Sequence, residues 1–177
     1  MRKTASLLFL LLAALSLTLW AQTKGRPAAT QRPQANLNQL MRGVLYPASN
    51  VVFSAQGDNP ADAKPPAGTD PSMATDPLLS TFGGWTAVEN AALALTESAN
   101  LLMIPGRTCS SGAPVPLTNP DWAKYVQALR DAGMVAFKAA QAKDQDKILD
   151  AADALTTACA NCHMKWREGR PAANRCK

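Results

Sequence analysis

The chain has 177 residues, 47% of them hydrophobic and 18% charged, which is enough for one domain with a buried core. Its net charge of +5 is not gathered into a basic block or a patch with interleaved aromatic residues, so nucleic acid is not expected as a partner. After the first 21 residues no apolar run is long enough to span a bilayer, so no membrane span is expected in the mature chain.

The first 21 residues are typical of a secretory signal peptide. Arg2 and Lys3 give it a charged start, residues 6–19 are apolar, and Ala21 is the predicted cleavage point. The two residues before Ala21 are larger than those that usually precede such a site, so an uncleaved membrane anchor is the alternative. We expect an exported, periplasmic protein whose net charge is +3 once residues 1–21 are removed.

Residues 22–33 predict a flexible lead-in, and residues 34–177 are expected to form one helical domain. The first helix is predicted over about 34–56, where apolar residues recur at the spacing of one helix face. Pro47 lies inside this helix and predicts a kink or a restart, and Gly43 four residues earlier reduces the crowding there. The apolar positions are Leu37, Leu40, Met41, Val44, Leu45, Ala48, Val51, Val52 and Ala55.

A long connector, residues 57–81, holds five prolines and four aspartates and is expected to be either mobile or functional. The second helix is predicted over about 82–104, and Pro105-Gly106 ends it. Its predicted buried positions are Trp85, Val88, Ala92, Leu95, Ala99 and Leu102.

A second loop, residues 107–120, carries Cys109 and leads into the third helix, which is predicted to begin near Asp121. Asn119 or Asp121 is the expected N-cap, and Pro120 suits the first turn of a helix, where no backbone N–H is needed. The predicted buried face of this helix is Trp122, Tyr125, Val126, Leu129, Gly133, Ala136, Phe137 and Ala140.

The fourth helix is predicted to begin within residues 143–146 and to stop at the Gly-Arg-Pro sequence of residues 169–171. It contains the densest group of reactive side chains in the protein, and these fall on its apolar stripe, which predicts that they face the core. The stripe is Ile148, Leu149, Ala152, Leu155, Cys159, Cys162, His163 and Trp166.

Cys159, Cys162 and His163 form a C-x-x-C-H pattern, which attaches c-type haem. Because positions i and i+3 of a helix share a face, both thiols can reach the two vinyl groups on one edge of a porphyrin and form thioethers. His163 lies on the same face and is the expected ligand of the iron. We therefore expect one covalently bound haem c. His163 is the only histidine, so no Ser/His/Asp set remains and we expect the protein not to be an enzyme.

Four helices with apolar faces and no strand pattern predict an all-α fold, an antiparallel up-down-up-down four-helix bundle with the haem-attachment motif near its C-terminus. In this arrangement Met41 and His163 lie at comparable depths near one end of the bundle. Cys109 and Cys176 lie at that same end. They are the two cysteines left over in an oxidising compartment, and they are therefore a candidate disulfide.

With these features the chain resembles the class II cytochromes c, which are the cytochrome c-prime family and its low-spin cytochrome c556 relatives. In that family a four-helix bundle carries C-x-x-C-H near the end of its last helix, followed by an aromatic residue and an arginine, here Trp166 and Arg167. A methionine of the first helix is the sixth iron ligand in the low-spin members, and Met41 matches that place. The resemblance implies an electron carrier with a His/Met-ligated haem iron, served by redox partner proteins whose identity the sequence does not give.

The alternative interpretation is that Met41 only fills the core. The haem iron would then be five-coordinate and would bind NO or CO, as in the cytochrome c-prime family. The far face of the haem would be lined by Leu37, Leu40, Val44 and Leu45. Arg167 or Lys165 is expected either to pair with a haem propionate or to be solvated. A homodimer is left open.

Two other classes of protein use closely spaced cysteines. A thioredoxin-like oxidoreductase places C-x-x-C at the start of a helix after a strand, whereas this motif is near the end of a helix. A zinc site would need four ligands, drawn from the four cysteines and the histidine, and the spacing fits this poorly.

Overall fold

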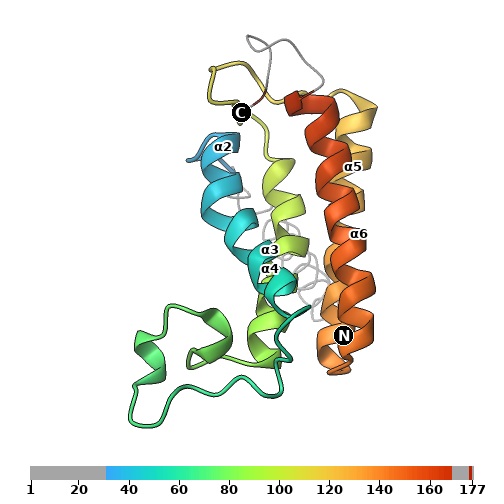
Figure 1. Ribbon diagram of the computed structural model, residues 1–177. Coiled ribbons are helices and arrows are strands. Elements are labelled where there is room, and N and C mark those ends of the chain that lie inside the picture. The colour runs from blue at the N-terminus through green and yellow to red at the C-terminus, as the bar shows by residue number, and fades with distance from the viewer. Residues whose placement is uncertain (1–30, 169–175, 177) are drawn as a thin grey trace, which may run out of the picture. The chain divides into compact units, whose positions relative to one another are not determined.

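Figure 1 shows a computed structural model of the chain, which describes residues 31–168 and Cys176. These residues are helical and contain no strand; the nearest thing to one is an isolated bridge between Thr108 and Pro114. The expected all-α class is therefore confirmed for the described part of the chain.

The predicted signal peptide, residues 1–21, lies outside the described residues, as do residues 22–30 of the predicted lead-in and residues 169–175. The chain from Arg32 onward forms one unit, and all of the elements below belong to it. No helix in the described part is both long and apolar enough to cross a membrane.

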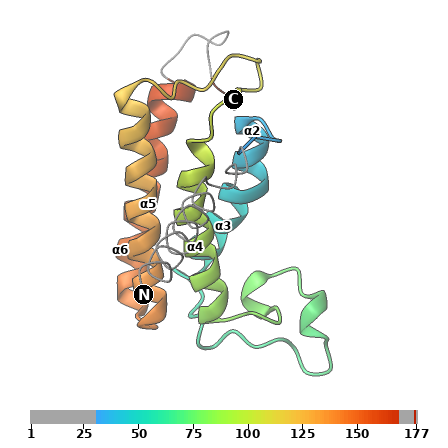
Figure 2. The same ribbon diagram turned by 180° about the vertical axis from the view of Figure 1, so that it is seen from behind.

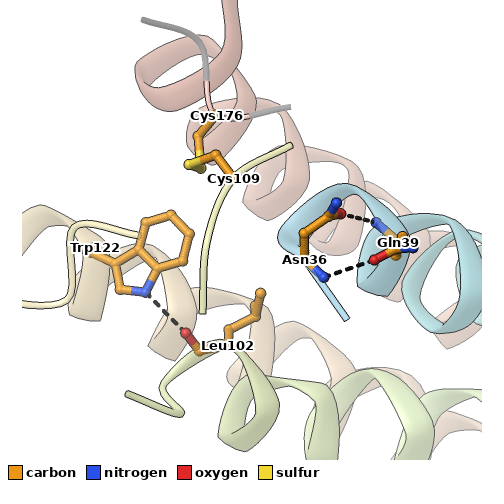
Figure 3. Close-up of a disulfide and its surroundings, with 6 residues drawn as sticks. All are labelled: Asn36, Gln39, Leu102, Cys109, Trp122 and Cys176. Carbon is orange, nitrogen blue, oxygen red and sulfur yellow. Dashed lines mark hydrogen bonds between the residues drawn. A yellow bond between two sulfur atoms is a disulfide. The ribbon is translucent and has the colours of Figure 1, made fainter. Parts of the chain in front are cut away.

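The first helical segment consists of α2 (Leu37–Leu40), the π-helix η1 (Met41–Leu45) and α3 (Tyr46–Ser54). It begins at a capping box, in which the Asn36 side chain accepts from the Gln39 N–H and the Gln39 side chain accepts from the Asn36 N–H, both at 2.9 Å (Figure 3). The helix predicted over 34–56 is thus present.

The interruption predicted at Pro47 takes the form of the π turn. Pro47 is the second residue of α3, and it has no N–H with which to continue an α-helical ladder. The N–H of Tyr46 donates to the carbonyl of Met41, five residues earlier, which is the hydrogen bond that defines a π turn. The helix continues through the proline by widening locally instead of stopping.

The connector after α3 contains two 3-10 helices, η2 (Pro71–Met73) and η3 (Pro77–Leu79). Leu78 anchors it, because its side chain is buried and its carbonyl accepts the Gly84 N–H at 2.8 Å. Gly84 has a φ of +59°, and a Cβ there would lie 2.9 Å from the Pro60 carbonyl oxygen, so only glycine fits.

Three long helices follow, α4 (Trp85–Leu102), α5 (Pro120–Gln141) and α6 (Gln145–His163), and α6 continues into the π-helix η4 (Met164–Glu168). Helix α3 packs on α4, α4 on α5, and α5 on α6. Asn119 is the N-cap of α5, as predicted, and its side chain accepts from the Asp121 N–H at 2.9 Å.

The predicted buried faces are largely confirmed. All six positions of the second predicted helix are buried in α4, and Trp122 and Val126 are buried in α5. Leu149 is an exception: we expected it on the buried stripe of α6, and it is 43% exposed. Ile148, Ala152 and Leu155 fill that stripe, and Leu149 lies one residue around the helix from it.

Gly133 allows α5 to approach α4 closely, and replacing it by alanine should destabilise the protein. A Cβ at this position would lie 2.5 Å from Oγ1 of Thr96 and 3.2 Å from the Ala92 carbonyl oxygen. Although alanine is the better helix former, we expect Gly133→Ala to lower the free energy of unfolding by about 1–3 kcal/mol, measured by urea denaturation. Gly43→Ala, where a Cβ meets nothing within 4 Å, is the matched control and should not be destabilised.

Arg107 ties the end of α4 to the start of α2. Its side chain is buried, and Nε and Nη2 donate to the Leu101 carbonyl at 3.1 and 3.0 Å while Nη1 donates to the Ala35 carbonyl at 2.6 Å. Burial lowers the pKa of this guanidinium. The neighbouring Thr108 carbonyl accepts the Leu37 N–H at 2.8 Å, so the α4–α5 loop is held against the first helical segment.

Candidate functional site

The three motif residues lie in the last turns of α6. Cys159 and Cys162 are free cysteines, and both are half-buried, as is His163. Their spacing puts them on one side of the helix, and all three line the same cavity. The sequence prediction that the motif faces inward agrees with this placement.

The cavity has a volume of about 1280 Å³, larger than the roughly 300–1,000 Å³ of most small-molecule sites. It lies between the first helical segment on one side and α6 with η4 on the other. Leu95 of α4 and Trp122 of α5, both almost completely buried, also line it. The first helical segment and α6 are also joined away from the motif. There the side chain of Gln145, at the start of α6, donates to the carbonyl of Ala55, just after α3.

Met41 lines this cavity from the first helical segment, on the side that faces the motif, and its side chain is half-buried. The structure therefore brings the four predicted site residues together: Cys159, Cys162, His163 and Met41. Of the four apolar residues expected around the far face, Leu37 and Leu45 line the cavity, whereas Leu40 and Val44 do not. The π turn that begins at Met41 accounts for the place of Val44, because its extra residue shifts the register of the residues in and after the turn. Leu40 precedes this turn and is buried in the core.

The sequence did not identify the polar and aromatic residues of the first helical segment that line the cavity, namely Asn38, Arg42, Tyr46, Ser49 and Phe53. Tyr46 is 66% exposed, so hydrophobic periodicity carried no signal for it. The available signal was that residues from Leu37 through Met41 to Phe53 recur every four residues. A regular α-helix has 3.6 residues per turn, so such a row drifts around the helix and does not stay on one face.

Next to the motif, Trp166 is buried and packs edge-on against Trp122, with ring centroids 5.8 Å apart. The indole N–H of Trp122 donates to the Leu102 carbonyl at 3.4 Å (Figure 3). The predicted Cys109–Cys176 disulfide is present, with Cα atoms 4.7 Å apart, and the Cys176 N–H donates to the Trp166 carbonyl at 3.2 Å. These contacts fix the turn that follows the motif.

Both arginine and lysine candidates for a propionate partner can now be placed. Arg167 lines the cavity. Lys165 forms an ion pair with Asp121 at 3.0 Å, and both side chains are more than 40% exposed, so this pair adds little stability.

Burial shifts the pKa values of the three motif side chains. It raises the pKa of the Cys159 thiol, and burial together with the neighbouring Cys159 raises the pKa of Cys162 to about 11. Burial, reinforced by Arg167 and opposed by Glu168, lowers the pKa of His163. At pH 7 both thiols are therefore protonated and the imidazole is neutral, with a lone pair available to a metal.

This protonation makes a testable difference from a thioredoxin-like protein, whose reactive thiol has a lowered pKa. With a pKa of about 11, about one Cys162 thiol in a thousand is ionised at pH 8, against roughly one in ten for a thiol with the ordinary pKa of 9.0. We expect alkylation of Cys162 in the haem-free chain to be slow at pH 8 and to accelerate towards pH 11, as followed by mass spectrometry.

The same shift has a defined sign for stability. A raised folded-state pKa favours folding below the ordinary thiol pKa of 9.0, and this contribution is lost as the pH rises through the folded-state value of about 11. Rapid alkylation of Cys162 at pH 7 would contradict a raised pKa of this thiol and would favour a redox-active cysteine.

A zinc site finds no support in the described residues, because nowhere among them do three or more His, Cys, Asp or Glu side chains gather to hold a metal ion. Two of the cysteines that such a site would need are joined in the disulfide.

No protein-family model, curated protein or solved structure matches the chain.

Proposed function

We propose that the chain is an exported class II-like c-type cytochrome that transfers single electrons. One haem is bonded to the thiols of Cys159 and Cys162, His163 is the proximal iron ligand, and Met41 is the sixth ligand. The observation that carries this proposal is that both free thiols, the only histidine and Met41 line one cavity although more than a hundred residues separate Met41 from the motif in the sequence.

The residues present fit a haem in several respects. The cavity is large and presents more apolar than polar surface, and two thiols at helical spacing lie on one of its walls. Haem supplies a one-electron iron couple, and a methionine opposite a histidine raises its potential. Among this chain's own residues, buried Leu95 and Trp122 give the cavity an apolar inner wall, and buried Trp166 holds the turn after His163 in place.

The fold completes the proposal. We take the helices to form the up-down-up-down bundle of the class II cytochromes, supported by the packing of each helix on the next. In Figures 1 and 2, α4, α5 and α6 each run back along the helix before them. This arrangement puts the end of α6 and the start of the first helical segment at the same end of the bundle. The protein acts in the periplasm as a carrier between redox proteins, without an enzymatic activity of its own.

Absorption spectra of the purified protein test the ligand set. We expect a low-spin ferric spectrum with a far-red methionine-to-iron charge-transfer band, and a ferrous form that does not bind CO. Met41→Ala should lose this band and admit CO, whereas Met164→Ala should keep it, because Met164 is adjacent to His163 in sequence and lies on the His163 side of the cavity.

Two outcomes would change the conclusion. A high-spin ferrous protein that binds CO without any substitution would remove Met41 as a ligand and favour the five-coordinate, NO- or CO-binding alternative. A purified protein without a haem spectrum would refute the cytochrome proposal as a whole.

A further inference from the structure

The residues of the first helical segment that line the cavity form an unusual row. Five of them recur every four residues: Leu37, Met41, Leu45, Ser49 and Phe53. In a regular α-helix each four-residue step advances about 40° around the axis, so such a row would spread over roughly 160°. A straight α-helix would therefore turn one end of this row away from the cavity.

The π turn η1 cancels part of this drift. Its i→i+5 hydrogen bond, from the Tyr46 N–H to the Met41 carbonyl, adds a residue to the turn, so a four-residue step there returns nearly to the same direction. The buried positions of the segment agree with this change of register. A regular helix would put Val44 on the face of Leu37 and Ala48, but Val44 is half-buried and Leu45 is the buried residue.

Pro47 gives a chemical reason why a regular α-helical turn does not form here. In an α-helix the residue at this position would donate its N–H to the Gly43 carbonyl, and the proline ring both removes that donor and presses on that carbonyl. Proline at position 47 therefore prevents the regular α-helical hydrogen bond, and the wider turn that starts at Met41 keeps the segment helical without it.

We infer that Pro47 is a positioning residue for the iron: through the π turn it aims Met41 across the cavity at the face that carries His163. This inference rests on the proposed His/Met ligation. It explains why a helix-breaking residue sits within a buried helical segment, six residues after the ligand. Without the proline, the segment can close into a regular α-helix, in which Met41 lies close to the direction of Ala48, seven residues on, and Ala48 is buried in the core.

The test is Pro47→Ala in the haem-loaded protein, with Gly43→Ala as the matched control. Gly43→Ala changes a residue of the same π turn and improves helix propensity, but it leaves the missing N–H at position 47. We expect Pro47→Ala to lose the far-red methionine-to-iron band and its ferrous form to bind CO, which the unsubstituted protein does not, as the ligated population falls. Its midpoint of urea unfolding should be equal to or higher than that of the unsubstituted protein, because alanine is the better helix residue. Gly43→Ala should keep the band.

If Pro47 positions Met41, Pro47→Ala loses the ligation of Met41 without a loss of stability. If Pro47 has only a general structural role, ligation and stability fall together. If Pro47→Ala keeps the band and still does not bind CO, or if it loses the band only together with a lower unfolding midpoint, the positioning role is overturned while His/Met ligation stands. If the unsubstituted protein holds haem but lacks the band, Met41 ligation fails, and the role of Pro47 fails with it.

Discussion

Replacing both motif cysteines, as Cys159→Ser/Cys162→Ser, is expected to abolish covalent attachment of haem completely. These are the two free cysteines of the chain, because the other two form the disulfide. No other thiol can therefore form a thioether to the porphyrin. Mass spectrometry of the denatured protein should show the added mass of one haem before substitution and none in the double variant.

Single variants make this result more specific. Cys159→Ser and Cys162→Ser should each retain one thioether, so a denatured sample should still carry haem, with a shifted absorption spectrum. Cys109→Ala/Cys176→Ala is the matched control, because it changes two cysteines without touching the motif, and it should retain the full added mass. A double motif variant that still carried covalent haem would show that the attachment chemistry lies elsewhere.

The positions of the helices could be predicted from the sequence because the local signals were strong and agreed with one another. Asn119 and Pro120 mark the start of α5 by capping chemistry, and Pro105-Gly106 follows the end of α4 closely. The connector before α4 was predicted only as mobile or functional. Its two Asp-Pro pairs were the missed signal, since Asp70 and Asp76 each cap a 3-10 helix that starts with proline.

The π turn could not be predicted in this form. Pro47 shows that an α-helical hydrogen bond is missing, but a proline is compatible with a kink, a restart or a widened turn. The outcome depends on which face the flanking residues bury, and this is decided by packing against α4 and by the cavity. For the same reason Tyr46 and Arg42 were missed as cavity-lining residues, whereas Cys159 and His163 were found from a local motif.

Removing the disulfide, as Cys109→Ala/Cys176→Ala, should have the largest effect on stability. The bridge joins residues 67 positions apart, and the loss of chain entropy in the unfolded state corresponds to about 4 kcal/mol. It connects the α4–α5 loop to a residue whose N–H donates to the Trp166 carbonyl, so its loss also releases the turn after His163. We expect the free energy of unfolding, from urea titration, to fall by about 2–5 kcal/mol.

Comparison of reduced and oxidised protein provides the control for this prediction. Reduction of the unsubstituted protein should lower the unfolding midpoint as much as the double variant does, and reduction of the double variant should change nothing further. A loss below about 1 kcal/mol would mean that the buried contacts of Trp122 and Trp166, together with Arg107, already hold this end of the domain. The disulfide would then restrain Cys176 without stabilising the haem-binding end, because the α4–α5 loop is also attached to Ala35 and Leu37 by hydrogen bonds that do not involve sulfur.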